Sequence, residues 1–138
     1  MSDTKEIYIS SLRVGNGTGV EVKPSIQAET IDTFDGPVNN GNDKISWEVS
    51  IEKLRYGTVK EYTDLEKLLF TMLTQPEPIK LIENVTMKDG SAKVTEIIYN
   101  CIISDKNYKW DTKSKTVENL TFKGEKLKKW VNNTLVTP

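Results

Sequence analysis

The stretch that decides the fold is Lys44–Glu52, with the sequence Lys-Ile-Ser-Trp-Glu-Val-Ser-Ile-Glu. Apolar and polar residues alternate along it without a break, which is typical of a β-strand with one buried face. The face expected to enter a core carries Ile45, Trp47, Val49 and Ile51. The face expected to meet water carries Lys44, Ser46, Glu48, Ser50 and Glu52. Such a strand needs further strands beside it and an apolar layer to cover it.

A short helix is predicted after this strand, over Thr63–Thr74. Thr63 and Glu66 stand three residues apart and fit a capping box at the helix start. An apolar stripe at helical spacing is formed by Leu65, Leu68, Leu69 and Met72. The stripe is expected to pack on the sheet, because a helix of about twelve residues is marginal alone. Phe70 lies off the stripe, and Pro76 and Pro78 are expected to stop the helix.

The remaining chain is predicted to consist of strands and turns. The further strands expected are Lys5–Ser10, Val20–Glu29, Ile79–Met87, Ala92–Ser104 and Thr116–Lys123. Ala92–Ser104 is the most apolar and is expected to be buried on both faces. Gly15–Gly19 is predicted to be a hairpin turn, and Pro24 an edge or bulged position. The chain is therefore predicted to be mainly β, a β-sandwich or barrel with one short flanking α-helix, in one domain over 1–138.

Three segments fall outside this regular pattern. The N-terminus, about residues 1–5, is polar and is expected to be flexible. Thr30–Asp43 is predicted to be a long loop or splayed hairpin with a functional role, since loops of this length are unusual in compact domains. Glu125–Pro138 has Leu127, Trp130 and Val131 at helical spacing. That segment is expected to be either a short terminal helix on its own domain or an arm that docks on a neighbouring subunit.

The composition excludes several functional classes. The chain has 19 Lys and Arg against 20 Asp and Glu, whereas a general nucleic-acid binder carries a basic excess. Histidine is absent, which removes Ser-His-Asp and Cys-His triads and histidine metal ligands. Cys101 is the one cysteine, so no intrachain disulfide is possible, and its apolar surroundings predict burial. The N-terminal sequence shows no signal peptide, so synthesis in the cytoplasm is expected.

No catalytic, cofactor or metal site is predicted. The glycines of Gly15–Gly19 lack the spacing of phosphate-binding loops. Asp32, Asp35 and Asp43 lack the ligand spacing of a calcium loop. Paired carboxylates such as Asp32, Asp35 and Glu48 have no spacing that supports glycoside hydrolysis. The protein is therefore not expected to be an enzyme.

Two parts of the sequence resemble the bacteriophage tail tube proteins, whose fold is shared by the tube protein of type VI secretion systems. The first is Phe34–Val38 leading into Ile45–Ile51, and the second is the late strand Val117–Lys123. The resemblance implies a structural protein of the virion tail that forms hexameric rings. The rings would stack into a hollow tube through which DNA passes without being read. Partners would be other copies, with sheath, tape-measure and baseplate proteins, and no membrane.

The resemblance also implies roles for particular residues. The loop that reaches between stacked rings would include Ile31, Phe34, Asp35, Gly36, Pro37 and Val38. The lumen would be lined by Ser46, Glu48 and Ser50, and the arm that docks on a neighbour would use Leu127, Trp130 and Val131. Ring closure would also pair exposed strand edges between subunits. Two alternatives stay open: another ring-forming tail or baseplate component, and a monomeric β-barrel that binds a small ligand.

Overall fold

The computed structural model describes the backbone of residues 4–27, 30–33, 36–39, 44–105 and 107–137, and the side chains of those that lie outside 26–44. The elements of the described chain are β1 (Thr4–Ile9), β2 (Leu12–Gln27), β3 (Thr30–Thr33), β4 (Gly36–Asn39), β5 (Lys44–Arg55), α1 (Val59–Thr71), β6 (Glu77–Met87), β7 (Gly90–Asp105), β8 (Lys109–Asp111), β9 (Thr116–Gly124), β10 (Lys126–Val131) and β11 (Thr134–Leu135).

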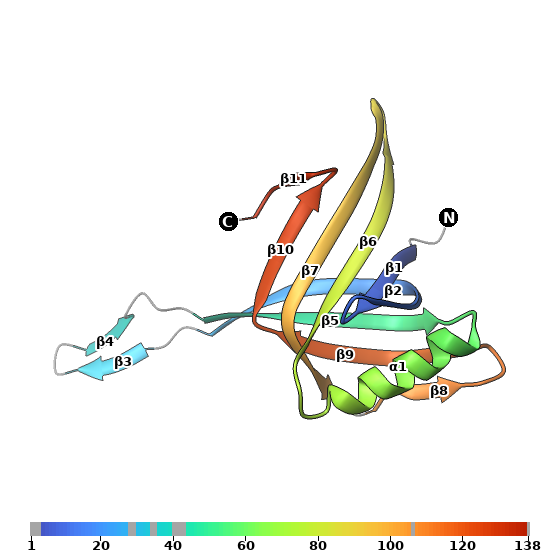
Figure 1. The fold of residues 1–138 in the computed structure, drawn as a ribbon. Coiled ribbons are helices and arrows are strands. Elements are labelled where there is room, and N and C mark those ends of the chain that lie inside the picture. The colour runs from blue at the N-terminus through green and yellow to red at the C-terminus, as the bar shows by residue number, and fades with distance from the viewer. Residues whose placement is uncertain (1–3, 28–29, 34–35, 40–43, 106, 138) are drawn as a thin grey trace.

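Six of these strands form a closed antiparallel ring in the order β7–β6–β1–β2–β5–β9, with β9 returning to β7 (Figure 1). The closing pair is short and joins Ile102 and Ile103 to Lys123 and Phe122. One core fills the ring, and its largest fully buried side chain is that of Phe122. The expected mainly β fold, a barrel with one short flanking helix, is confirmed.

The anchor strand was predicted correctly and runs longer than expected, as β5. Val49 and Ile51 are fully buried, whereas Trp47 is half-buried and Ile45 is 47% exposed. The apolar face of β5 therefore enters the core only in its second half. Trp47 packs against the edge of that core.

The turn between the first two strands lies earlier than predicted. It is formed by Ser10 and Ser11, which both have positive φ angles, of 52° and 69°. Two consecutive residues of this kind make the tight hairpin turn that suits the twist of a sheet. Gly15–Gly19 lies inside β2, so its prediction as a turn was wrong. A Cβ atom on Gly15 would lie 2.2 Å from the Arg55 carbonyl oxygen, so this glycine allows close approach of two strands.

The barrel wall bends along one row that crosses three strands. Successive buried side chains of a strand are normally two residues apart. On β5, however, the buried residues Ile51 and Leu54 are three residues apart, and so are Leu120 and Val117 on β9. The row between them includes Gly19 and Asn119, whose φ angles are 64° and 62°. Side chains on both sides of the bend therefore point into the core.

The helix begins earlier than predicted. The cap is Thr58, whose hydroxyl accepts a hydrogen bond from the Glu61 amide at 3.1 Å. Thr63 instead donates its hydroxyl to the Val59 carbonyl, inside the helix. Both Thr58-x-x-Glu61 and Thr63-x-x-Glu66 fit a capping box, and the earlier one is used. The predicted stripe is confirmed, because Leu65, Leu69 and Met72 are buried and Leu68 is half-buried.

β7 is buried on one face only, which corrects the expectation for Ala92–Ser104. Ile98 and Ile103 point into the core, while Ile102 is 38% exposed. Asn100 has a φ angle of 56° and shifts the alternation, so Ile98 and Cys101 both face inward. The far halves of β6 and β7 extend beyond the barrel as a long hairpin (Figure 1).

The C-terminal segment is extended, so of the two alternatives expected for it the terminal helix is wrong. β10 pairs along the edge of β7, and β11 folds back on β10. The free edge of β7 provides hydrogen-bonding partners, and this tertiary pairing overrides the helical spacing of the apolar residues. β9 continues into β10 through Gly124, where a Cβ atom would lie 2.3 Å from Ile98 Cγ2 and 2.8 Å from Cys101 Sγ.

Candidate assembly surfaces

The polar face of β2, β5 and β9 brings together the three predicted lumen residues. Register places Ser50 between Glu21 and Thr121, and Glu48 between Lys23 and Lys123. Ser46 and Ser50 are half-exposed and Glu48 is exposed. Opposite charges therefore alternate across the strands, and the face carries no excess of either sign in these two rows.

Some polar side chains of this face are paired with groups of the same face. Lys23 Nζ lies 3.0 Å from a carboxylate oxygen of Glu21. The hydrogen bond and charge of Glu21, with a smaller contribution from Glu48, raise the pKa of Lys23 above its usual value. The Ser46 hydroxyl donates to the Ser25 carbonyl at 3.4 Å. Since Lys23 already has an anionic partner, it has little to offer a phosphate backbone.

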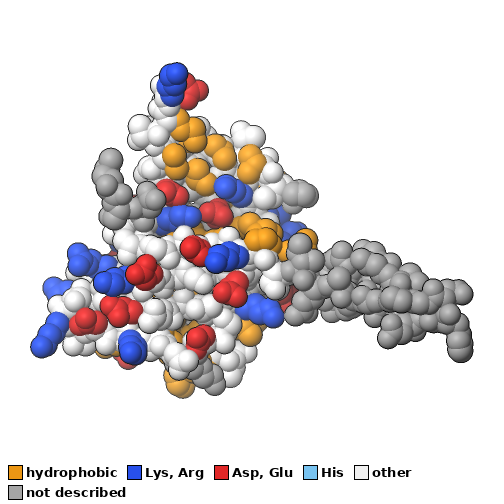
Figure 2. Space-filling model, turned by 180° about the vertical axis from the view of Figure 1, so that it is seen from behind, with side chains coloured by type: hydrophobic (Ala, Val, Ile, Leu, Met, Phe, Trp, Pro, Cys, Tyr) orange, Lys and Arg blue, Asp and Glu red, His pale blue; other side chains and the backbone are white. Residues whose placement is uncertain are grey.

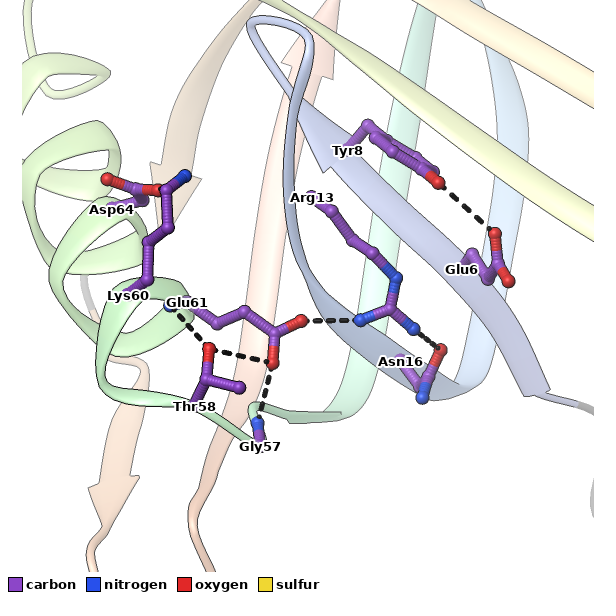
Figure 3. A network of polar contacts seen from close by, with 9 residues as sticks. All are labelled: Glu6, Tyr8, Arg13, Asn16, Gly57, Thr58, Lys60, Glu61 and Asp64. Carbon is purple, nitrogen blue, oxygen red and sulfur yellow. Dashed lines mark hydrogen bonds and ion pairs between the residues drawn. The ribbon is translucent and has the colours of Figure 1, made fainter.

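The helix is fastened to the barrel by a polar network at its N-terminus (Figure 3). Glu61 accepts hydrogen bonds from the Gly57 amide at 2.9 Å and from the Arg13 guanidinium. The second guanidinium nitrogen of Arg13 donates to Asn16 Oδ1 at 2.9 Å. Glu61 thus links the helix cap to β2, a role that the sequence alone did not reveal.

An aromatic cluster lies beside that helix end. The ring centroids of Tyr56 and Tyr62 are 5.1 Å apart, and that of Trp110 lies 5.3 Å from Tyr62. Burial raises the pKa of the Tyr56 hydroxyl. A groove of about 290 Å³ runs past Tyr56 and Tyr62, with Val59 at its rim. The cluster holds the β8 loop against the helix.

The predicted docking-arm residues lie in β10. Leu127 packs against the core of its own barrel, whereas Trp130 and Val131 are half-exposed. We call the part of the sheet formed by β6, β7, β10 and β11 the extension. Successive residues of a strand face opposite sides, so Trp130 shares the outer face of the extension and Val131 the inner one. Figure 2 shows apolar side chains gathered along the extension, below its charged tip. The role of these residues in docking on a neighbour stays a prediction.

The predicted ring-stacking loop contains a hairpin. β3 and β4 pair with each other, with Ile31 opposite Val38 and Thr33 opposite Gly36. They form a separate two-stranded sheet that projects from the barrel (Figure 1). Phe34 and Asp35 lie outside the described residues, so the assignment of this loop to ring stacking stays a prediction.

No catalytic arrangement emerges from the described residues. Burial raises the pKa of the Cys101 thiol to about 12, so it stays protonated and is a poor nucleophile. Across the described parts of the chain, no three residues of the types His, Cys, Asp and Glu come together to hold a metal ion. Nor does the described chain include a helix with the length and apolar character to cross a membrane.

The geometry thus defines a class: a closed antiparallel barrel with a flanking helix, a projecting hairpin and a four-stranded extension. A chain of the virion of a native gene transfer agent particle has this fold, with a TM-score of 0.52 over 96% of each chain at 8% sequence identity. Hcp protein, known from a crystal structure, matches with a TM-score of 0.55, 12% identity, and coverage of 99% of this chain and 98% of its own.

No protein-family model matches the sequence, and no curated protein matches it. The likeness of fold extends over nearly the whole of both chains in each comparison. The chain therefore shares its fold with both of these proteins, as the resemblance led us to expect.

Proposed function

We propose that this chain is a structural virion protein that forms hexameric rings, which stack into the hollow tail tube of a phage-like particle. DNA would be delivered through the tube without specific binding. The whole of 1–138 would act as one tail-tube-like domain. The protein would have no catalytic activity and would reside in the tail of the virion.

The observation that carries this proposal is the full-length likeness of fold to a chain of a virion. The match extends over 96% of both chains, and so beyond the six-stranded barrel. A protein with this fold and without a catalytic arrangement in its described residues fits a structural role.

The charge pattern of the β2–β5–β9 face supports its place at the lumen. Glu21, Glu48, Lys23 and Lys123 balance one another. Clustered lysines would hold the DNA backbone and would resist its passage. A polar and balanced face avoids that contact while it keeps the channel wet.

The free edge of β2 supports ring formation. β1 pairs with β2 only as far as Thr18, so among the described strands β2 has one unpaired edge from Gly19 onward. Pro24, predicted to lie at an edge, falls within this part. An exposed edge of this length invites a strand from another chain. Closure of a ring between subunits would satisfy it.

The assembly would have further partners. The β3–β4 hairpin would contact the next ring, and Trp130 and Val131 would face a neighbouring subunit. Sheath, tape-measure and baseplate proteins would bind the tube outside or at its ends.

Mass measurement of the purified protein in solution tests this proposal, together with electron microscopy of the same sample. We expect a particle of six times the 15.7 kDa chain mass, and hollow tubes at higher concentration. A monomer at every concentration would contradict the proposal and favour a ligand-binding barrel. Rings that never stack would favour another ring-forming tail or baseplate component.

A further inference from the structure

We propose that the segment 28–43 of one copy docks on a lysine strip of a neighbouring copy. The lysine strip consists of Lys80 on β6, Lys93 on β7, and Lys126 and Lys128 on β10. The inference rests on the proposed function, because it names the surface that receives the projecting hairpin when copies assemble.

Register places the four lysines on one face. Lys80 and Lys128 both stand opposite Ile97, on its two sides. Lys126 lies two residues before Lys128, and Lys93 lies four residues before Ile97, so both share that face. The other face carries Ile79, Ile98 and Leu81, which are buried in the core. The lysine strip therefore lies on the outside of the extension.

The lysine strip has little negative charge of its own. Lys80 lies over the ring of Tyr8, with Nζ 4.7 Å from the centroid. The acid on the same face, Glu6, accepts a hydrogen bond from the Tyr8 hydroxyl. Among the described residues, Lys93, Lys126 and Lys128 have no carboxylate within ion-pair distance.

A shallow hollow marks one end of the lysine strip. It measures about 500 Å³ and is lined by Tyr99, Asn100, Glu125, Lys126 and Lys128. Glu125, the one acid of this lining, accepts a hydrogen bond from the Asn100 side chain at 3.1 Å. The hollow could receive the side chains of a docked segment.

The segment 28–43 has the complementary charge. It contains four acidic residues, Glu29, Asp32, Asp35 and Asp43, and neither lysine nor arginine. The chain as a whole has a net charge of −1, so this segment is a strong local excess. Four acids on the segment thus match four lysines on the strip.

Apolar side chains reinforce the match. Ile82, Ile97 and Trp130 share the face of the lysine strip and are half-buried. The segment 28–43 contributes Ile31, Phe34 and Val38. A contact with an apolar centre and charged surroundings is the usual composition of a specific protein interface.

The proposed contact joins two copies. β3 and β4 pair only with each other among the described strands, and in Figure 1 they point away from the β6–β7 extension. A projecting segment on one side and its receptor on another form a heterologous contact. Such a contact repeats from copy to copy and builds a ring or a filament.

A peptide of residues 28–43 tests the contact directly, by fluorescence anisotropy with the full-length protein. We expect binding that weakens by roughly tenfold in the triple variant Lys93→Glu/Lys126→Glu/Lys128→Glu. The matched control is Lys109→Glu/Lys113→Glu/Lys115→Glu, with the same charge change at exposed positions around β8, and it should bind as the wild type does. No binding, or equal loss in both variants, would overturn the inference.

Charge exchange in assembly completes the test. Tubes should fail to form in the lysine-strip variant and in Glu29→Lys/Asp32→Lys/Asp35→Lys, and should return when both sets are combined in one chain. Normal tubes in the lysine-strip variant would overturn the inference and leave the proposed function intact. Peptide binding without tubes would support the contact and contradict the proposed function. Equal binding of duplex DNA and peptide to the strip would overturn the assignment of a protein partner.

Discussion

Two outward faces of one continuous sheet differ in how they treat charge. On the polar face of β2, β5 and β9, Lys23 and Lys123 stand on either side of Glu48, and Lys23 forms an ion pair with Glu21. On the face of β6, β7 and β10, lysines such as Lys126 and Lys128 stand without a carboxylate partner among the described residues. The first face is suited to let a polyanion pass, and the second is suited to hold an acidic partner.

Both faces depend on the same core, and Phe122 is its largest buried side chain. Phe122→Ala should lower the free energy of unfolding by about 3–5 kcal/mol, because a cavity forms where β5, β7 and β9 meet. Chemical denaturation followed by circular dichroism measures this. The control Phe70→Ala, at a side chain that is 77% exposed, should change stability by less than about 0.5 kcal/mol. A similar loss in both variants would contradict the placement of the core.

Gly124 joins the two faces, because β9 passes into β10 there. Gly124→Ala should cost about 1–3 kcal/mol, since its Cβ would meet Ile98 and Cys101 side chains. Thermal unfolding measures the loss. Gly90→Ala is the control for steric crowding, because no atom lies within 4 Å of a Cβ at that position. A larger loss at Gly90 than at Gly124 would show that backbone strain outweighs crowding, since Gly90 has a φ angle of 145°.

The balance of charge on the polar face can be broken on purpose. Ser46→Lys combined with Ser50→Lys should increase affinity for duplex DNA by roughly tenfold at low salt, because each new cation contacts a phosphate. Electrophoretic mobility shift measures this. Thr63→Lys with Thr74→Lys, at exposed positions on the helix side, is the matched control. In assembled tubes, the Thr63→Lys/Thr74→Lys control should retain as much DNA as the wild type. Equal DNA retention by the control and by the Ser46→Lys/Ser50→Lys variant would place neither face at the lumen.

Cys101 lies where the two faces join, and we expect the smallest effect on stability from this residue. Its pKa is raised by burial from 9.0 to about 12, so the folded state keeps a proton that the unfolded state loses. This contribution to stability is complete below pH 9 and is lost as pH rises toward 12. Relative to Cys101→Ala, the wild type should therefore lose stability across that window and not at neutral pH. Equal pH profiles would mean that the thiol is accessible to water.

The sequence predicted most securely what depends on one strand or one helix face. The alternation of Lys44–Glu52 and the stripe of Leu65, Leu69 and Met72 both appear as expected. Each pattern can be recognised within a single strand or helix, because one face of that element is buried. The full-length fold followed from the same patterns together with a family resemblance.

The errors arose where a residue type admits two physical roles. The glycines of Gly15–Gly19 were interpreted as a turn, yet they allow strands to approach closely, while Ser10 and Ser11 make the turn. The spacing of Leu127 and Trp130 fits a helix, but the open edge of β7 recruits the segment as a strand. The lysine strip was not predictable, since it requires the register of three strands that are distant in sequence.

The pairing of β1 with β6 bears on the order in which the chain folds. Ile7 pairs with Leu81, and Ile103 pairs with Phe122, so the barrel closes only through contacts between distant parts of the chain. Local hairpins such as β6–β7 form quickly, whereas such distant pairings are slow. The β6–β7 hairpin is therefore expected to form before β9 pairs with β7 and closes the barrel.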